Sequence, residues 1–180
     1  MKNEENEIKK SKKIYEDFFK KEPIGYRFPL GVLRDKEYKI LKENGFKFDS
    51  SIFPTYRPGF FNNLDKPLNI YNEEGIIEIP FSVISKTIRI PLSLSYIKLF
   101  YPLHFLKKYN NNPLIFDFHI HDLYMLNSTK KLSTMKKLPY IRYRDNGVHL
   151  FLRFCNNLKE QGYESIKISK VYEKFISDQL

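Results

Sequence analysis

The chain has 180 residues, enough for one domain with a sizeable core, and its 42% hydrophobic and 16% aromatic content is typical of a globular protein rather than a disordered one. Its formal net charge of +10 comes from lysines scattered among acids, so we do not expect a nucleic-acid partner on charge alone. The single cysteine, Cys155, excludes an internal disulfide and favours a reducing compartment, which predicts a cytoplasmic protein.

The first 22 residues are predicted to form a leading charged helix, and residues 23–180 a single domain. Apolar residues recur at helical spacing from Ile8 to Phe19, and Glu22-Pro23 ends the helix. The charged start has no apolar stretch of the kind found in signal peptides, so we expect no signal peptide. The next helix is predicted over 35–44, with Asn44-Gly45 as its end.

Short strands are predicted before and after that helix, over 24–27, 46–48 and 76–79. Between the last two, residues 55–74 are rich in Pro, Gly and Asn and indicate a long loop. The most apolar stretch, 88–106, contains charges and prolines, so we expect no membrane span.

The remaining chain continues the alternation of helices and strands. The predicted helices are 93–109, 147–161 and 169–176, the predicted strands are 114–118 and 163–168, and residues 125–143 are predicted to be a polar loop. The helix over 147–161 is predicted to turn one apolar face inward. That face consists of Val148, Phe151, Leu152, Cys155 and Leu158. We therefore interpret Cys155 as a core residue rather than a nucleophile.

This alternation predicts an α/β fold with about four parallel strands and flanking helices, too few strands to close an eight-stranded barrel. In parallel sheets the working residues lie on loops after the carboxyl ends of strands. Arg27, Asp49 and His119 each follow a predicted strand, so we expect them to share a site.

Three segments carry a resemblance to a known family. They are Gly25-Tyr26-Arg27-Phe28-Pro29-Leu30-Gly31, Phe48-Asp49-Ser50-Ser51-Ile52-Phe53-Pro54 and Ile115-Phe116-Asp117-Phe118-His119. In this order and spacing they resemble the second half of a polysaccharide deacetylase domain of the NodB type. The resemblance implies that residues 23–180 are the C-terminal portion of a partial (β/α) barrel. The implied reaction is metal-dependent removal of acetyl groups from a glycan.

The resemblance also implies roles for the first motif. Arg27 corresponds to the arginine that orients the family's catalytic base, and the backbone N–H of Leu30 to a donor that stabilises the oxyanion. Leu30 departs from the usual aromatic residue there. The alternative is a strand that ends in a proline turn, with Arg27 in a surface salt bridge.

The later motifs are predicted to supply the acid and the substrate contacts. By resemblance His119 is the general acid, and Asp49, His121 and Phe118 are predicted to contact substrate. For Asp49 we favour an Asx turn, in which its side chain bonds its own backbone. Asp117, His119 and His121 also resemble the Asp-x-His-x-His of amidohydrolases, where both histidines bind metal. Three ligands on one strand cannot close a tetrahedron, so we expect at most weak zinc binding.

The family's Thr-Phe-Asp-Asp-Gly-like and His-x-x-x-His motifs, which supply the base and the metal ligands, do not occur in these residues. We therefore expect no metal ligands and no deacetylase activity in this chain alone, although the complete family domain holds a zinc-like divalent metal. The expected partners are a glycan and either a separate chain with the N-terminal half or a second copy. The alternatives are a non-catalytic glycan-binding or assembly module, then an amidohydrolase, and last a nucleic-acid binder.

Overall fold

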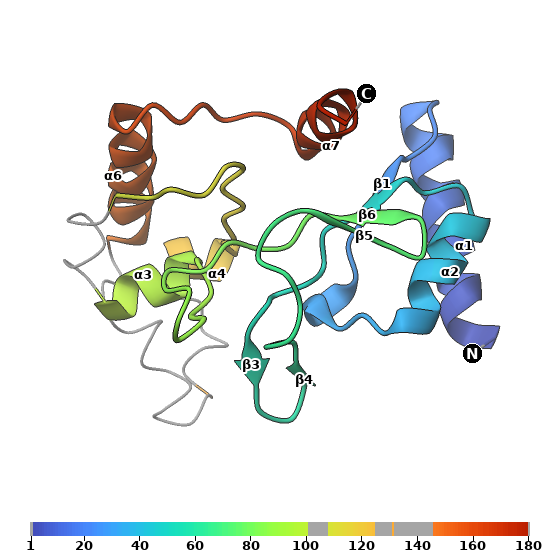
Figure 1. The fold of residues 1–180 in the computed structure, drawn as a ribbon, viewed down its shortest axis with the longest axis horizontal. Coiled ribbons are helices and arrows are strands. Elements are labelled where there is room, and N and C mark those ends of the chain that lie inside the picture. The colour runs from blue at the N-terminus through green and yellow to red at the C-terminus, as the bar shows by residue number, and fades with distance from the viewer. Residues whose placement is uncertain (1, 101–107, 125–130, 132–145, 180) are drawn as a thin grey trace. The chain divides into compact units, whose positions relative to one another are not determined.

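The computed structural model describes residues 2–100, 108–124, 131 and 146–179 (Figure 1). The chain divides into two compact units. Unit 1 comprises residues 1–81 and 167–180, and unit 2 comprises residues 82–166. The predicted loop over 125–143 lies outside the described residues except for residue 131.

Unit 1 is built on a four-stranded mixed sheet with the order β1-β2-β6-β5. Its strands are β1 (Gly25–Tyr26), β2 (Phe48–Asp49), β6 (Ile76–Glu78) and β5 (Tyr71–Glu73). The first three are parallel neighbours, as the alternation of strands and helices predicts. β5 pairs antiparallel with β6 through a tight hairpin, in which Gly75 has a φ of +87°.

Helices α1 (Lys2–Phe19), α2 (Asp35–Glu43) and α7 (Ile168–Ser177) complete unit 1. The helix predicted over 35–44 is confirmed, and Asn44 with Gly45 ends it because Gly45 adopts a left-handed φ of +84°. One buried cluster joins α1, α2 and the sheet. Its members are Ile8, Tyr38, Leu41, Phe46 and Ile76. On the sheet, Phe48 of β2 stacks on Tyr172 of α7 with ring centroids 5.4 Å apart.

The segment over 55–74 is not a continuous loop. It contains the hairpin of β3 (Tyr56–Arg57) and β4 (Phe61–Asn62), followed by β5. Gly59 lies in the hairpin turn with a φ of +78°, so the Pro and Gly that indicated a loop form a tight turn instead. Asn63 anchors the hairpin, because its N–H donates to the carbonyl oxygen of Thr55 at 3.0 Å.

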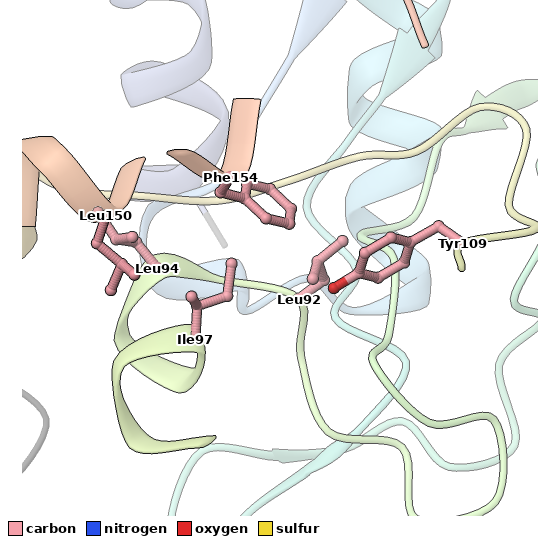
Figure 2. Close-up of a cluster of buried hydrophobic side chains, with 6 residues drawn as sticks. All are labelled: Leu92, Leu94, Ile97, Tyr109, Leu150 and Phe154. Carbon is pink, nitrogen blue, oxygen red and sulfur yellow. The ribbon is translucent and has the colours of Figure 1, made fainter. Parts of the chain in front are cut away.

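Unit 2 contains helices α3 (Leu94–Phe100), α4 (Ile120–Leu123) and α6 (Gly147–Glu160). The helix predicted over 93–109 is confirmed for Leu94–Phe100, residues 101–107 lie outside the described residues, and Lys108 and Tyr109 are not helical. The core of the unit is one cluster of buried side chains from α3, α6 and the segments beside them. Its members are Leu92, Leu94, Ile97, Tyr109, Leu150 and Phe154 (Figure 2).

Two strand predictions in the second half of the chain are wrong. Residues 114–118 run extended but form only an isolated parallel bridge, between Asp117 and Ser93. Ser82 holds the segment instead, since its N–H bonds the carbonyl oxygen of Ile115 and its Oγ accepts the N–H of Ile115. Residues 163–167 form no strand either. The Tyr163 hydroxyl donates to backbone oxygens rather than extending a sheet.

The helix predicted over 147–161 is confirmed as α6, but its inward face is not the predicted one. Leu150 and Phe154 are buried, whereas Leu152 and Cys155 are exposed. The interpretation of Cys155 as a core residue is therefore wrong. Phe151 and Leu158 do pack against the core, so the true inward face is shifted by part of a turn from the predicted one.

The described residues thus form a mixed α/β fold with a four-stranded sheet and no closed barrel. None of the helices in the described part of the chain is long and apolar enough to cross a membrane.

Candidate functional site

The turns that follow β1 and β2 are joined by side-chain hydrogen bonds. Arg27 Nε donates to the carbonyl oxygen of Ser50 at 2.8 Å, and Arg27 Nη2 donates to Ser50 Oγ at 3.0 Å. The backbone N–H of Phe28 donates to Ser51 Oγ at 2.7 Å. The guanidinium carbon also lies 4.6 Å from the centroid of the Phe81 ring. Arg27 is therefore held in one orientation although it is exposed to solvent.

The turn after Arg27 has a left-handed backbone. Leu30 has φ 63° and ψ 4°, a conformation that is uncommon outside glycine, and its side chain is exposed. Gly31 follows with a φ of +66°, and a Cβ there would lie 2.9 Å from the carbonyl oxygen of Ser51. Only glycine fits this position, because the turn after β1 packs against the turn after β2. The predicted role of the Leu30 backbone N–H stays a prediction.

Two buried carboxyl groups lie side by side at the ends of β2 and β6. Asp49 and Glu78 are partners in the parallel register, and both are 0% exposed. Glu78 Oε1 accepts the N–H of Ile52 at 3.1 Å, and Glu78 Oε2 accepts the hydroxyl of Tyr38 at 3.1 Å. Asp49 Oδ1 accepts the N–H of Ser51 at 2.8 Å, which is the Asx-turn bond favoured for this residue.

The second carboxylate oxygen of Asp49, Oδ2, indicates where the carboxyl pair can hold a proton. Among the described residues, Asp49 Oδ2 has no hydrogen-bond donor when both acids are ionised. A proton on Glu78 supplies that donor. Burial raises the pKa of Asp49 to about 6, although bonds with Ser51 and Glu78 act to lower it. Burial and the neighbouring Asp49 charge raise the pKa of Glu78 well above its ordinary value. Both shifts favour a proton held between the two carboxyl groups.

Glu78 was missed as a site residue by sequence reasoning. The sequence does contain a pattern that points to Glu78, because it is the one acid within the otherwise apolar run Ile76-Ile77-Glu78-Ile79. A buried acid in a strand requires a partner or a proton. Asp49 was predicted to contact substrate, but the structure places its carboxyl group inside unit 1, against Glu78.

In unit 2, His119 joins an extended segment to α4. Its backbone is extended (φ −120°, ψ 156°), and its N–H donates to Asp122 Oδ2 at 2.9 Å. The imidazole is 60% exposed, with Nδ1 3.8 Å from both Asp117 Oδ2 and Asp122 Oδ2. The ring of His121 stacks on that of His119 with centroids 4.8 Å apart. An exposed imidazole beside two carboxylates is suited to donate or accept a proton.

Asp122 fixes this arrangement from inside the unit. It is almost fully buried, and its Oδ1 accepts a short hydrogen bond from Ser95 Oγ of α3. Burial lowers the pKa of Lys98, a fully buried lysine of the same helix, while the charge of Asp122 raises it. The first residue of α6, Gly147, packs against the backbone of α4. A Cβ on Gly147 would lie 2.4 Å from the carbonyl oxygen of Asp122. The close approach of α6 to α4 therefore requires glycine at position 147.

The predicted site residues fall in both units. Arg27, Leu30 and Asp49 belong to unit 1, while Phe118, His119 and His121 belong to unit 2. Phe118 is partly exposed and packs its ring on Phe151 with centroids 4.6 Å apart. Within each unit the predicted residues lie close together. A single site that unites Arg27, Asp49 and His119 stays a prediction.

Comparison with known proteins found no match for this chain among protein-family models, curated proteins or solved structures.

Proposed function

We propose that this chain is the C-terminal portion of a NodB-type polysaccharide deacetylase-like domain, whose reaction is hydrolysis of acetyl groups on a glycan. The observation that carries the proposal is the contact between two of the motifs that resemble the family. The turn that starts at Arg27 and the turn that starts at Asp49 are bonded through Ser50 and Ser51. Motifs separated by about twenty residues in the sequence thus meet at the carboxyl ends of parallel strands, where α/β proteins place their sites.

In this proposal the chain supplies positioning and acid groups. His119 donates a proton to the leaving group, Arg27 orients the base, and the backbone N–H of Leu30 stabilises the oxyanion. His121 and Phe118 contact the glycan, and Asp49 acts from inside the sheet by holding the turn that binds Arg27.

The divalent metal of the complete family domain does not fit the residues around Arg27. Unit 1 contains no histidine and no cysteine, and its carboxyl pair at the site is buried and bonded internally. We therefore assign the base and the metal ligands to a separate chain or segment that carries the other two motifs.

The first prediction is that this chain alone releases no acetate from chitin oligosaccharides or acetylated xylan when zinc or cobalt is added. The reason is that the motifs for the base and the metal do not occur in these residues. Acetate release is measured directly, and binding of acetylated and deacetylated oligosaccharides is compared by ligand-observed NMR. We expect binding that prefers the acetylated form.

Either of two results would contradict the proposal. Acetate release that His119→Ala abolishes and His149→Ala leaves intact would show that the chain completes its own catalytic site. If the chain bound neither oligosaccharide, a glycan would not be its ligand and the proposal would be wrong. His149 is the matched control because it is an exposed histidine on α6 and takes no part in the His119 cluster.

A second candidate function, a non-catalytic glycan-binding module, is favoured by the β3–β4 hairpin. Tyr56 and Phe60 are both exposed there, and the Arg57 guanidinium carbon lies 4.1 Å from the centroid of the Phe60 ring. Exposed aromatic faces are surfaces on which rings of a ligand can stack.

The second prediction separates this candidate from the first. In a binding module, oligosaccharide affinity is independent of acetylation and falls at least tenfold in Phe60→Ala. The Phe60→Ala change removes the exposed ring of the hairpin without touching a buried residue. If affinity follows acetylation and is unchanged in Phe60→Ala, the hairpin is not the binding surface, and the deacetylase-like proposal stands.

A further inference from the structure

Three potential metal ligands converge at the start of α4. His119, His121 and Asp122 each offer one ligand atom, and the three atoms lie within 4.8 Å of one another. No other group of this kind occurs among the residues that the structure describes. Two imidazoles and one carboxylate form a donor set typical of zinc and its transition-metal neighbours, and not of magnesium or calcium.

The backbone explains why these residues meet. On one straight strand, Asp117, His119 and His121 would lie along a line and could not surround an ion, which was the reason to expect at most weak zinc binding. The chain instead turns at His119 from extended backbone into the helical turn of α4. This change of direction brings His119 over the turn that carries His121 and Asp122, and the two imidazoles stack. The geometric objection therefore does not apply to His119, His121 and Asp122.

The three ligands differ in how firmly they are held. Asp122 is almost fully buried and bonded to Ser95 and to the His119 N–H, so its carboxylate is fixed before any ion arrives. The His119 imidazole is exposed and can rotate. Donor atoms around a tetrahedral zinc are about 3.3 Å apart, as follows from bonds of about 2.0 Å. Rotation of the histidine side chains is the movement that would bring atoms within 4.8 Å of one another to that separation.

The local charge also favours a cation. The carboxylates of Asp117 and Asp122 both flank His119 Nδ1. The opposing charge is Lys98, which is buried beneath Asp122. Asp122 uses Oδ1 for Ser95, and its Oδ2 lies 3.8 Å from His119 Nδ1 and accepts the His119 N–H. Oδ2 can share its remaining lone pair with an ion.

We propose that His119, His121 and Asp122 bind one divalent transition-metal ion of the zinc class, with the remaining coordination positions open to water. Three protein ligands with open positions are typical of accessible sites rather than closed structural ones. This inference is separate from the glycan chemistry proposed above, because the family's metal ligands lie in motifs that these residues do not contain. An imidazole bound to an ion does not carry the extra proton of a general acid, so the two roles of His119 exclude each other.

Isothermal titration of the whole chain with Zn²⁺ tests the proposal. We expect one zinc per chain with micromolar affinity, weakened at least tenfold in both His119→Ala and His121→Ala. The control His149→Ala removes an exposed histidine of the same unit and is expected to leave the affinity unchanged. Mg²⁺ and Ca²⁺ are expected not to compete, because they prefer oxygen ligands.

The His119 change keeps the test independent of folding, whereas His121 is partly buried. His119 is largely exposed and contributes no buried side chain, so its replacement by alanine leaves the core of unit 2 intact, which far-UV circular dichroism checks. The proposal is overturned if the wild-type chain binds no zinc, if binding survives either the His119 or the His121 change, or if His149→Ala weakens it equally.

Discussion

Glu78→Gln is expected to stabilise the protein at neutral pH and to reduce the fall of its stability with rising pH. Glu78 and Asp49 are fully buried neighbours, and the raised pKa values of both favour one proton held between them. Glutamine has the shape of the protonated glutamate and stays neutral at every pH. Its amide can donate to the unsatisfied Oδ2 of Asp49, and its oxygen can accept the N–H of Ile52.

The direction of the pH dependence follows from the number of protons that the folded and the unfolded state each bind. Both acids have pKa values in the folded protein above their ordinary values, that of Asp49 at about 6. The folded state therefore holds more protons than the unfolded state once the pH exceeds about 4. The stability contributed by the pair is complete below that pH and is lost as the pH rises through the folded pKa values. For a difference of one bound proton, the free energy of unfolding falls by about 1.4 kcal/mol per pH unit.

Urea unfolding at pH 4.5, 6 and 7.5, followed by circular dichroism, measures the effect. We expect Glu78→Gln to gain about 2 kcal/mol over the wild type at pH 7.5 and almost nothing at pH 4.5. The control Glu43→Gln changes an exposed acid of α2 and is expected to alter stability little at any pH. A wild-type advantage at pH 7.5 would mean that Glu78 is ionised in the folded protein and that the shared proton does not exist.

The sequence predicted the elements with strong local signals. α2 is bounded by Asn44-Gly45, and the parallel strands before and after it follow from short apolar runs with clear ends. β5 was missed because its antiparallel pairing with β6 depends on a contact between strands, to which local composition gives no clue. The segment over 114–118 has strand composition, but its backbone hydrogen bonds join Ile115 to Ser82 and Asp117 to Leu92 and Leu94, which makes an isolated bridge and not a strand.

Helix faces and paired charges were harder to predict. α6 is apolar on more than one side, so periodicity identified the helix but could not decide between the face of Leu152 and that of Leu150. For the candidate site, Arg27, Asp49 and His119 were identified by their place after predicted strands. Glu78 and Asp122 act through partners that are distant in the sequence, Asp49 and Ser95, and only the fold reveals those pairs.

The last prediction is that the chain self-associates at tens of micromolar, the range in which open edges and apolar patches associate. Within the sheet of unit 1, β1 has β2 on one side and no neighbouring strand on the other among the described residues. The same unit exposes large apolar side chains at the end of α1, where Phe18 is 77% exposed beside Ile14 and Phe19. Exposed apolar side chains that are grouped in this way, rather than scattered singly, are typical of contact surfaces.

Sedimentation velocity across a dilution series measures this, with Phe18→Glu and Asn6→Glu compared with the wild type. Both changes add one negative charge to exposed positions of α1, and only Phe18→Glu removes an apolar ring. Phe18→Glu is expected to weaken association at least tenfold, and Asn6→Glu to leave it unchanged. If only the open edge of β1 drove association, both variants would associate like the wild type.

A wild-type chain that sediments as a monomer throughout and unfolds cooperatively would instead show that unit 1 closes its own edge. The proposal of a separate chain with the missing half would then lose its structural support, because no surface of unit 1 would require a partner.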